Sequence, residues 1–92
     1  MKLKVEFLGL ARELAGDAEA VVTVDDRATW HDLISALADA YPSFVGPIVL
    51  PDRSNLTAAY MLNVGGRAIV RDLDVPVQPG QRLLLMFAEA GG

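Results

Sequence analysis

Residues 29–42 read TWHDLISALADAYP, and they carry the clearest secondary-structure signal in the chain. Thr29 is a good helix N-cap, and Asp32, three residues later, can complete a capping box with it. Pro42 cannot continue a helix, so the helix is expected to end at Tyr41. Apolar residues recur at spacings of three and four, which predicts one buried stripe: Trp30, Leu33, Ile34, Leu37, Ala38 and Tyr41.

Alternating residues on both sides of this helix predict β-strands. Apolar and charged side chains alternate through residues 2–8, which is typical of a strand with one buried face. A short amphipathic stretch follows at residues 10–14, and residues 19–24 form a second strand that closes a hairpin-like unit with the first. Residues 82–87 are apolar on both faces, as expected of a strand in the centre of a sheet.

The region after the helix is interrupted by turn residues. Residues 43–57 contain glycine and prolines among apolar residues, which favours a short helical turn or two and then a polar loop. Residues 58–64 are expected to form a strand. Gly65-Gly66 suits a two-residue hairpin turn, with residues 67–70 as the returning strand. Pro79-Gly80 is a second turn signal, placed before the last strand.

This order of elements predicts a small α+β domain. The first and last strands are expected to pair in parallel at the centre of one mixed sheet, with the one main helix packed on one face. The residues expected in the core share the inward phase of their elements: Leu3, Val5, Phe7, Leu33, Ile34, Leu37, Leu62, Leu83 and Leu85.

Composition excludes several classes of function. The 92 residues fit one domain, and the formal net charge of −4 argues against binding to nucleic acid, which needs a basic face. The absence of cysteine excludes disulfides, thiolate catalysis and thiolate-held metals on this chain. The N-terminal residues alternate charged and apolar side chains, whereas a secretory signal needs an unbroken apolar core. No apolar run is long enough to span a membrane. A cytoplasmic protein without membrane contact is therefore expected.

Several stretches together resemble the small subunit of molybdopterin synthase and its relatives, among them the thiamine-pathway sulfur carrier. The resemblance covers nearly the whole chain and depends on the order of five short matches: residues 7–16 (FLGLARELAG), the helix between Ala28-Thr29 and Tyr41-Pro42, residues 64–67 (VGGR), residues 79–83 (PGQRL), and Gly91-Gly92 at the end. The final residues read FAEAGG here, where molybdopterin-type carriers usually have a proline-containing run similar to PPVAGG.

The resemblance implies a ubiquitin-like β-grasp domain over residues 1–87, followed by a flexible tail over residues 88–92. It also implies that the chain carries sulfur, in molybdopterin synthesis or a related pathway. The expected partners are a ubiquitin-activating-type adenylating enzyme, a sulfur donor and a sulfur-accepting synthase subunit. The adenylating enzyme would use ATP, and this chain would bind no cofactor or metal of its own.

The last two residues of the tail would carry this chemistry. Gly92 would present its carboxylate for adenylation and then become a thiocarboxylate, while Gly91 keeps the tail narrow enough to enter a partner's active site. All catalytic side chains would belong to the partners, so the chain is expected not to be an enzyme.

The outward face of the last strand is the expected docking surface. If Leu83 and Leu85 face the core, Leu84 and Met86 point the other way, and Ile69 on the neighbouring strand can join them. Exposed apolar patches of this kind often mark partner sites. The alternative is that residues 44–50 cover this face within the monomer.

Two other functions remain open from the sequence: a ubiquitin-like modifier joined to lysines through Gly92, and a β-grasp module that binds partners without covalent chemistry. The remaining conspicuous residues have simpler interpretations. His31 has no ligand partners at metal spacing and is expected to be an exposed helix-start residue. The pairs Asp25-Asp26 and Asp72/Asp74 are expected to be solvated turn residues. Three arginines are expected on a solvated face that could also meet an acidic partner: Arg67, Arg71 and Arg82.

Overall fold

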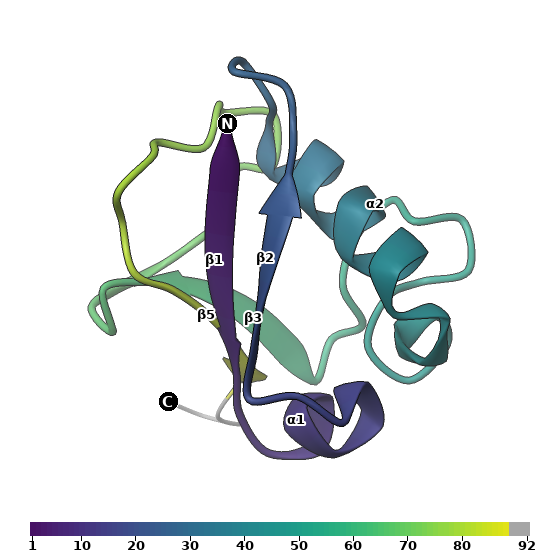
Figure 1. Cartoon of the computed structure of the whole chain (residues 1–92). Helices are drawn as coiled ribbons and strands as arrows, with labels where there is room; N and C mark the ends of the chain where they lie inside the picture. The colour runs from purple at the N-terminus through teal and green to yellow at the C-terminus, as the bar shows by residue number, and fades with distance from the viewer. Residues whose placement is uncertain (89–92) are drawn as a thin grey trace.

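The structure is a computed structural model that describes residues 1–88. One five-stranded sheet has the order β2-β1-β5-β3-β4 (Figure 1). Its strands are β1 (Lys2–Phe7), β2 (Glu19–Thr23), β3 (Tyr60–Val64), β4 (Ala68–Ile69) and β5 (Leu83–Phe87). The two central strands, β1 and β5, pair in parallel, and the other neighbours pair antiparallel. The predicted mixed sheet is confirmed.

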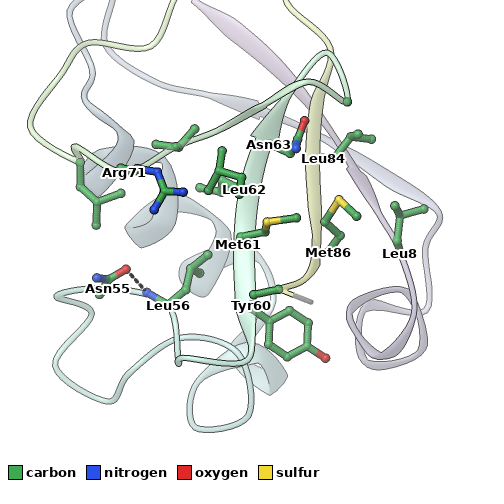
Figure 2. A pocket seen from close by; sticks show the side chains of 15 residues that line it. Leu8, Asn55, Leu56, Tyr60, Met61, Leu62, Asn63, Arg71, Leu84 and Met86 are labelled. Carbon is green, nitrogen blue, oxygen red and sulfur yellow. Dashed lines mark hydrogen bonds between the residues drawn. The ribbon is translucent and has the colours of Figure 1, made fainter. Parts of the chain in front are cut away.

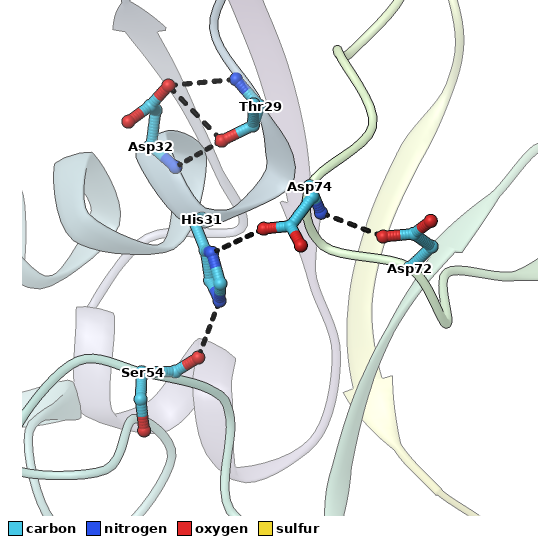
Figure 3. Close-up of polar contacts among 6 residues, drawn as sticks. All are labelled: Thr29, His31, Asp32, Ser54, Asp72 and Asp74. Atoms are coloured by element: carbon cyan, nitrogen blue, oxygen red, sulfur yellow. Dashed lines mark hydrogen bonds and ion pairs between the residues drawn. The ribbon is translucent and has the colours of Figure 1, made fainter.

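Helix α2 (Trp30–Ala40) begins with the capping box expected from the sequence. The Asp32 amide donates to the Thr29 hydroxyl oxygen at 3.3 Å, and the Thr29 amide donates to the Asp32 carboxylate at 2.9 Å (Figure 3). Two of the amides that a helix start leaves unpaired are thus satisfied locally. Tyr41 is the C-cap, directly before Pro42. The helix lies across one face of the sheet (Figure 1).

The core lies between α2 and this face of the sheet. All nine residues expected in the core are buried. Phe7 meets Tyr41 and Phe44 edge to face, with ring centroids 5.2 and 5.3 Å apart. Phe44 therefore packs on the side that α2 covers, and Ile48 and Val49 belong to the same core cluster. The alternative that residues 44–50 cover the opposite face is wrong.

Other elements differ from expectation mainly in length. The stretch of residues 10–14 is part of a short helix, α1 (Leu10–Ala15). The helical turn expected within residues 43–57 is a 3₁₀ turn, η1 (Pro42–Phe44), which begins one residue earlier. Gly65 and Gly66 form the expected turn with positive φ values of 65° and 74°. The returning strand β4 has only two residues instead of the expected four. Within residues 1–88, no helix combines the length and apolar character needed to cross a membrane.

Candidate functional site

The face of the sheet opposite α2 carries a groove beside the end of β5 (Figure 2). The groove has a volume of about 700 Å³ and is lined by residues from β3, β4, β5 and the adjoining loops. Most of the lining side chains are apolar. The lining residues include Leu8, Tyr60, Met61, Asn63, Ile69, Arg71, Leu84, Met86 and Ala88.

The three side chains expected on this face, Leu84, Met86 and Ile69, all line the groove. Ile69 is 45% exposed and Met86 is partly buried. The expectation that Leu84 is exposed is wrong, since it is only 5% exposed. Leu84 is buried because it sits in the central strand, in register with Glu6 of β1 on one side and Asn63 of β3 on the other. It therefore forms the floor of the groove, and Met86 and Ile69 offer the accessible apolar surface.

Sequence analysis missed two apolar residues of this surface, Met61 and Leu8. Met61 lies in β3 directly across from Met86, and Leu8 follows the end of β1 and is 41% exposed. The signal for Met61 was present in the sequence, because Leu62 was expected in the core and its neighbours must then face outward. Leu8 offered the same signal, because it follows Phe7, an expected core residue, at the end of the strand expected over residues 2–8; the observed strand β1 ends one residue earlier, at Phe7.

Asn63 is a third residue of this groove that was not expected from the sequence. It is buried in the wall of the groove, and its side-chain oxygen has no hydrogen-bond partner among residues 1–88. Most buried side-chain oxygens are hydrogen-bonded, so an oxygen without a partner in a groove wall is unusual.

Charged residues border the apolar surface. Arg82 donates to the Glu6 carboxylate at 2.6 Å, and this hydrogen bond lowers the pKa of the Glu6 carboxyl below its usual value. Lys4 pairs with Glu19 at 3.0 Å. Arg71 lines the groove, and no carboxylate within residues 1–88 pairs with it (Figure 2). The three arginines noted in the sequence thus differ: Arg82 is paired outside the groove, Arg71 lines it, and Arg67 is exposed in the turn before β4.

The end of β5 brings the chain to the edge of the groove. The Ala88 amide donates to the Ala59 carbonyl at 2.8 Å, and Ala88 is itself a lining residue. The backbone is therefore paired one residue beyond the expected domain boundary at residue 87. Gly91 and Gly92, the residues expected to be activated and threaded, lie outside the described residues.

His31 has a structural role and does not line this groove. Its Nε2 lies 2.7 Å from the Ser54 carbonyl oxygen and its Nδ1 lies 3.4 Å from the Asp74 carboxylate (Figure 3). Asp72 accepts from the Asp74 amide at 3.0 Å, as expected of a turn residue. His31 thus links the start of α2 to two loops. Within residues 1–88, no three side chains of metal-binding type are grouped to hold an ion.

Comparisons with known proteins find matches among solved structures. No family model and no curated protein sequence matches the chain. Among solved structures, small archaeal modifier protein 1 from Haloferax volcanii superposes with a TM-score of 0.82 at 24% identity, over 100% of both chains.

Two other solved structures cover almost the whole chain. A protein named as molybdopterin converting factor subunit 1, from Pyrococcus furiosus, has a TM-score of 0.71 at 23% identity and covers 95% of this chain and 97% of its own. A chain of the BexX/CysO complex from Amycolatopsis orientalis has a TM-score of 0.71 at 20% identity and covers 97% of this chain and 98% of its own. These neighbours agree with the resemblance read from the sequence, and the chain has the ubiquitin-like β-grasp fold.

Proposed function

We propose that this chain is a ubiquitin-like sulfur carrier that works through the carboxylate of Gly92. The observation that carries the proposal is the position of Ala88. It is the last residue that the structure describes, its amide is paired with the Ala59 carbonyl, and it lines the apolar groove. The sequence continues from it to Gly91-Gly92. Docking surface and reactive end are therefore close together along the chain.

The proposed chemistry has two steps, and both use catalytic groups of a partner. A Gly92 carboxylate oxygen attacks the α-phosphorus of ATP, so that an acyl–phosphate bond forms and pyrophosphate leaves. Hydrosulfide from a sulfur donor then attacks the acyl carbon, and AMP leaves with the former carboxylate oxygen. The products are a thiocarboxylate on Gly92, AMP and a proton. ATP is the only cofactor, and the adenylating enzyme binds it.

The groove is the proposed docking site for that adenylating enzyme. Four residues extend at most about 14 Å, so an enzyme that holds the Gly92 carboxylate must come within this distance of Ala88. Such an enzyme would cover the surface of Met86, Met61 and Ile69 beside Ala88. A sulfur-accepting synthase subunit, of the molybdopterin type by resemblance, must meet the same constraint in turn. Methionine side chains are adaptable, which suits a surface that serves two partners.

The names of the structural neighbours support this proposal at a general level. They include a modifier protein, a subunit of a converting factor and a member of a two-protein complex. Each name indicates a protein that modifies, or assembles with, another protein.

A reconstitution tests the function directly. The chain would be mixed with ATP and the adenylating enzyme encoded in the same genome, and release of pyrophosphate would be followed. Pyrophosphate release that depends on the chain is expected, with AMP released once hydrosulfide is added. The absence of chain-dependent pyrophosphate release would contradict the proposal.

A second candidate function is protein modification, which the similarity to small archaeal modifier protein 1 favours. A modifier would share the adenylation step but end in an isopeptide bond between Gly92 and a lysine. Denaturing gels of cell extract, probed for the tagged chain, separate the two functions. Higher-mass conjugates that survive denaturant would indicate modification, and their absence would leave sulfur transfer as the use of the activated carboxylate.

Substitution of Met86 tests the docking site. Met86→Asp places a charge on the accessible part of the groove, and we expect binding to the adenylating enzyme to weaken by about tenfold or more, as loss of a central interface contact does. Calorimetric titration would measure the dissociation constant. The matched control is Val21→Asp on β2, which carries the same change at a site that is 61% exposed and does not line the groove. Equal weakening by both substitutions would contradict the proposed site.

A further inference from the structure

Phe87, the last residue of β5, has an environment that its position in the strand does not explain. It shares the inward phase of Leu83 and Leu85, which are fully buried, yet Phe87 is 47% exposed. Phe87 is neither covered nor loose, because two specific contacts hold its ring.

The first contact is with Tyr60, which is opposite Phe87 in the antiparallel pair of β3 and β5. The two rings are stacked, with centroids 4.7 Å apart and planes inclined by 29°. Tyr60 itself is buried, and its hydroxyl has no hydrogen-bond partner within residues 1–88. Burial accordingly raises the pKa of the Tyr60 hydroxyl. The ring of Tyr60 is thus retained in place by packing, with no polar anchor, and Phe87 forms one side of that packing.

The second contact is with Gly9, at the start of α1. A Cβ atom at this glycine would lie 3.2 Å from Cε2 and 3.3 Å from Cδ2 of the Phe87 ring. Gly9 also has a φ of 61° and a ψ of −131°, a conformation that other residues rarely adopt. The Leu8 amide donates to the Leu85 carbonyl at 3.1 Å, which keeps this loop against β5. Glycine at this position both makes the turn and leaves room for the ring.

These contacts lie directly before Ala88, the last residue with a described backbone hydrogen bond. From the packing of Phe87 between Gly9 and Tyr60, we infer that Phe87 is a positioning residue, which fixes Ala88, the residue from which the sequence continues to Gly92. The inference rests on the proposed function, since its consequence is faster capture of the Gly92 carboxylate by the adenylating enzyme. Phe87 need not touch ATP or the reacting atoms.

The expected size of the effect follows from chain entropy. Fixing the backbone of one residue costs about 1–2 kcal/mol, and about 1.4 kcal/mol changes a rate tenfold. If loss of the ring frees Phe87 and Ala88, the enzyme must order them again at each activation. We therefore expect Phe87→Ala to lower kcat/KM for adenylation by about tenfold or more. Binding to the enzyme should change by less than about threefold, because the groove residues remain.

Three variants test the inference beside the wild-type chain. Phe87→Ala removes both ring contacts, Phe87→Tyr keeps them and should restore activation, and Gly9→Ala pushes a methyl group against the ring and should impair activation as Phe87→Ala does. Pyrophosphate release gives kcat/KM, and calorimetric titration gives the dissociation constant. A purely structural role would weaken binding of Phe87→Ala in parallel with its activation, and that outcome would overturn the inference. The comparison uses Phe87→Ala and Phe87→Tyr, because the φ of 61° at Gly9 destabilises Gly9→Ala whatever the ring does.

Hydrogen exchange of the Ala88 amide separates this inference from the proposed function. We expect this amide to exchange at least about tenfold faster in Phe87→Ala than in the wild type, because its bond to Ala59 opens more often. Unchanged exchange, or wild-type activation in Phe87→Ala, overturns the inference while the proposed function stands. If the wild-type chain is not adenylated at all, the proposed function fails, and the exchange comparison alone decides whether Phe87 holds the end of β5.

Discussion

A chain that lacks Gly92 is expected to lose thiocarboxylate formation by more than about 100-fold, and a chain extended to Gly-Gly-Ala is expected to lose it equally. The deletion leaves the terminal carboxylate about 3.5 Å short of its normal reach, and the extension moves it beyond that reach. Displacements of about 1 Å in an active site already cost rates about 100-fold. Mass spectrometry of the chain after incubation with ATP, adenylating enzyme and hydrosulfide measures the product.

Neither change should alter stability, because every buried core residue among residues 1–88 precedes Phe87. Equal melting temperatures for the wild-type and altered chains would establish that the loss is chemical. Full activity from the chain ending in Gly-Gly-Ala would contradict the role of Gly92 as the reactive residue.

Leu37→Ala is expected to lower the free energy of unfolding by about 2–5 kcal/mol, the usual cost of truncating a fully buried leucine. Leu37 is 1% exposed and lies in the stripe of α2 that faces the sheet. The loss combines the lost burial of the side chain with the cavity that remains. Chemical denaturation followed by the fluorescence of Trp30, the single tryptophan of the sequence, would measure it.

The control for Leu37→Ala is Val21→Thr, which exchanges two side chains of similar shape at an exposed position of β2. Its cost should stay within about 0.5 kcal/mol, as is usual for surface substitutions. A loss of under about 0.5 kcal/mol for Leu37→Ala would show that α2 packs with a different face than the one described.

Local signals explain why most of the fold was predictable. The Thr29–Asp32 box and Pro42 define both ends of α2 through interactions within a few residues. The doubly apolar last strand indicated a central position, which β5 occupies. Residues 43–57 were less predictable because Gly46 and Pro47 disrupt any periodic pattern, and tertiary packing on Phe7 decides where this segment lies.

The site was predictable only where strand periodicity applies. Alternation placed Leu84 and Met86 on one face, but it could not show that Leu84 is covered by its neighbours in a five-stranded sheet. The contact between Gly9 and Phe87 joins opposite ends of the chain, and no local pattern carries such information. The burial of the Asn63 side-chain oxygen without a partner among residues 1–88 likewise depends on the position of β3 between β5 and β4, which no local pattern predicts.

The most direct test of the proposed sulfur carrier is the intact mass of the chain after reaction with ATP, the adenylating enzyme and hydrosulfide, with fragmentation to locate the change. The account predicts a mass gain equal to the replacement of one oxygen by one sulfur, confined to the fragment that contains Gly92. An unchanged mass under conditions in which the enzyme consumes ATP, or sulfur located in any other fragment, would contradict it.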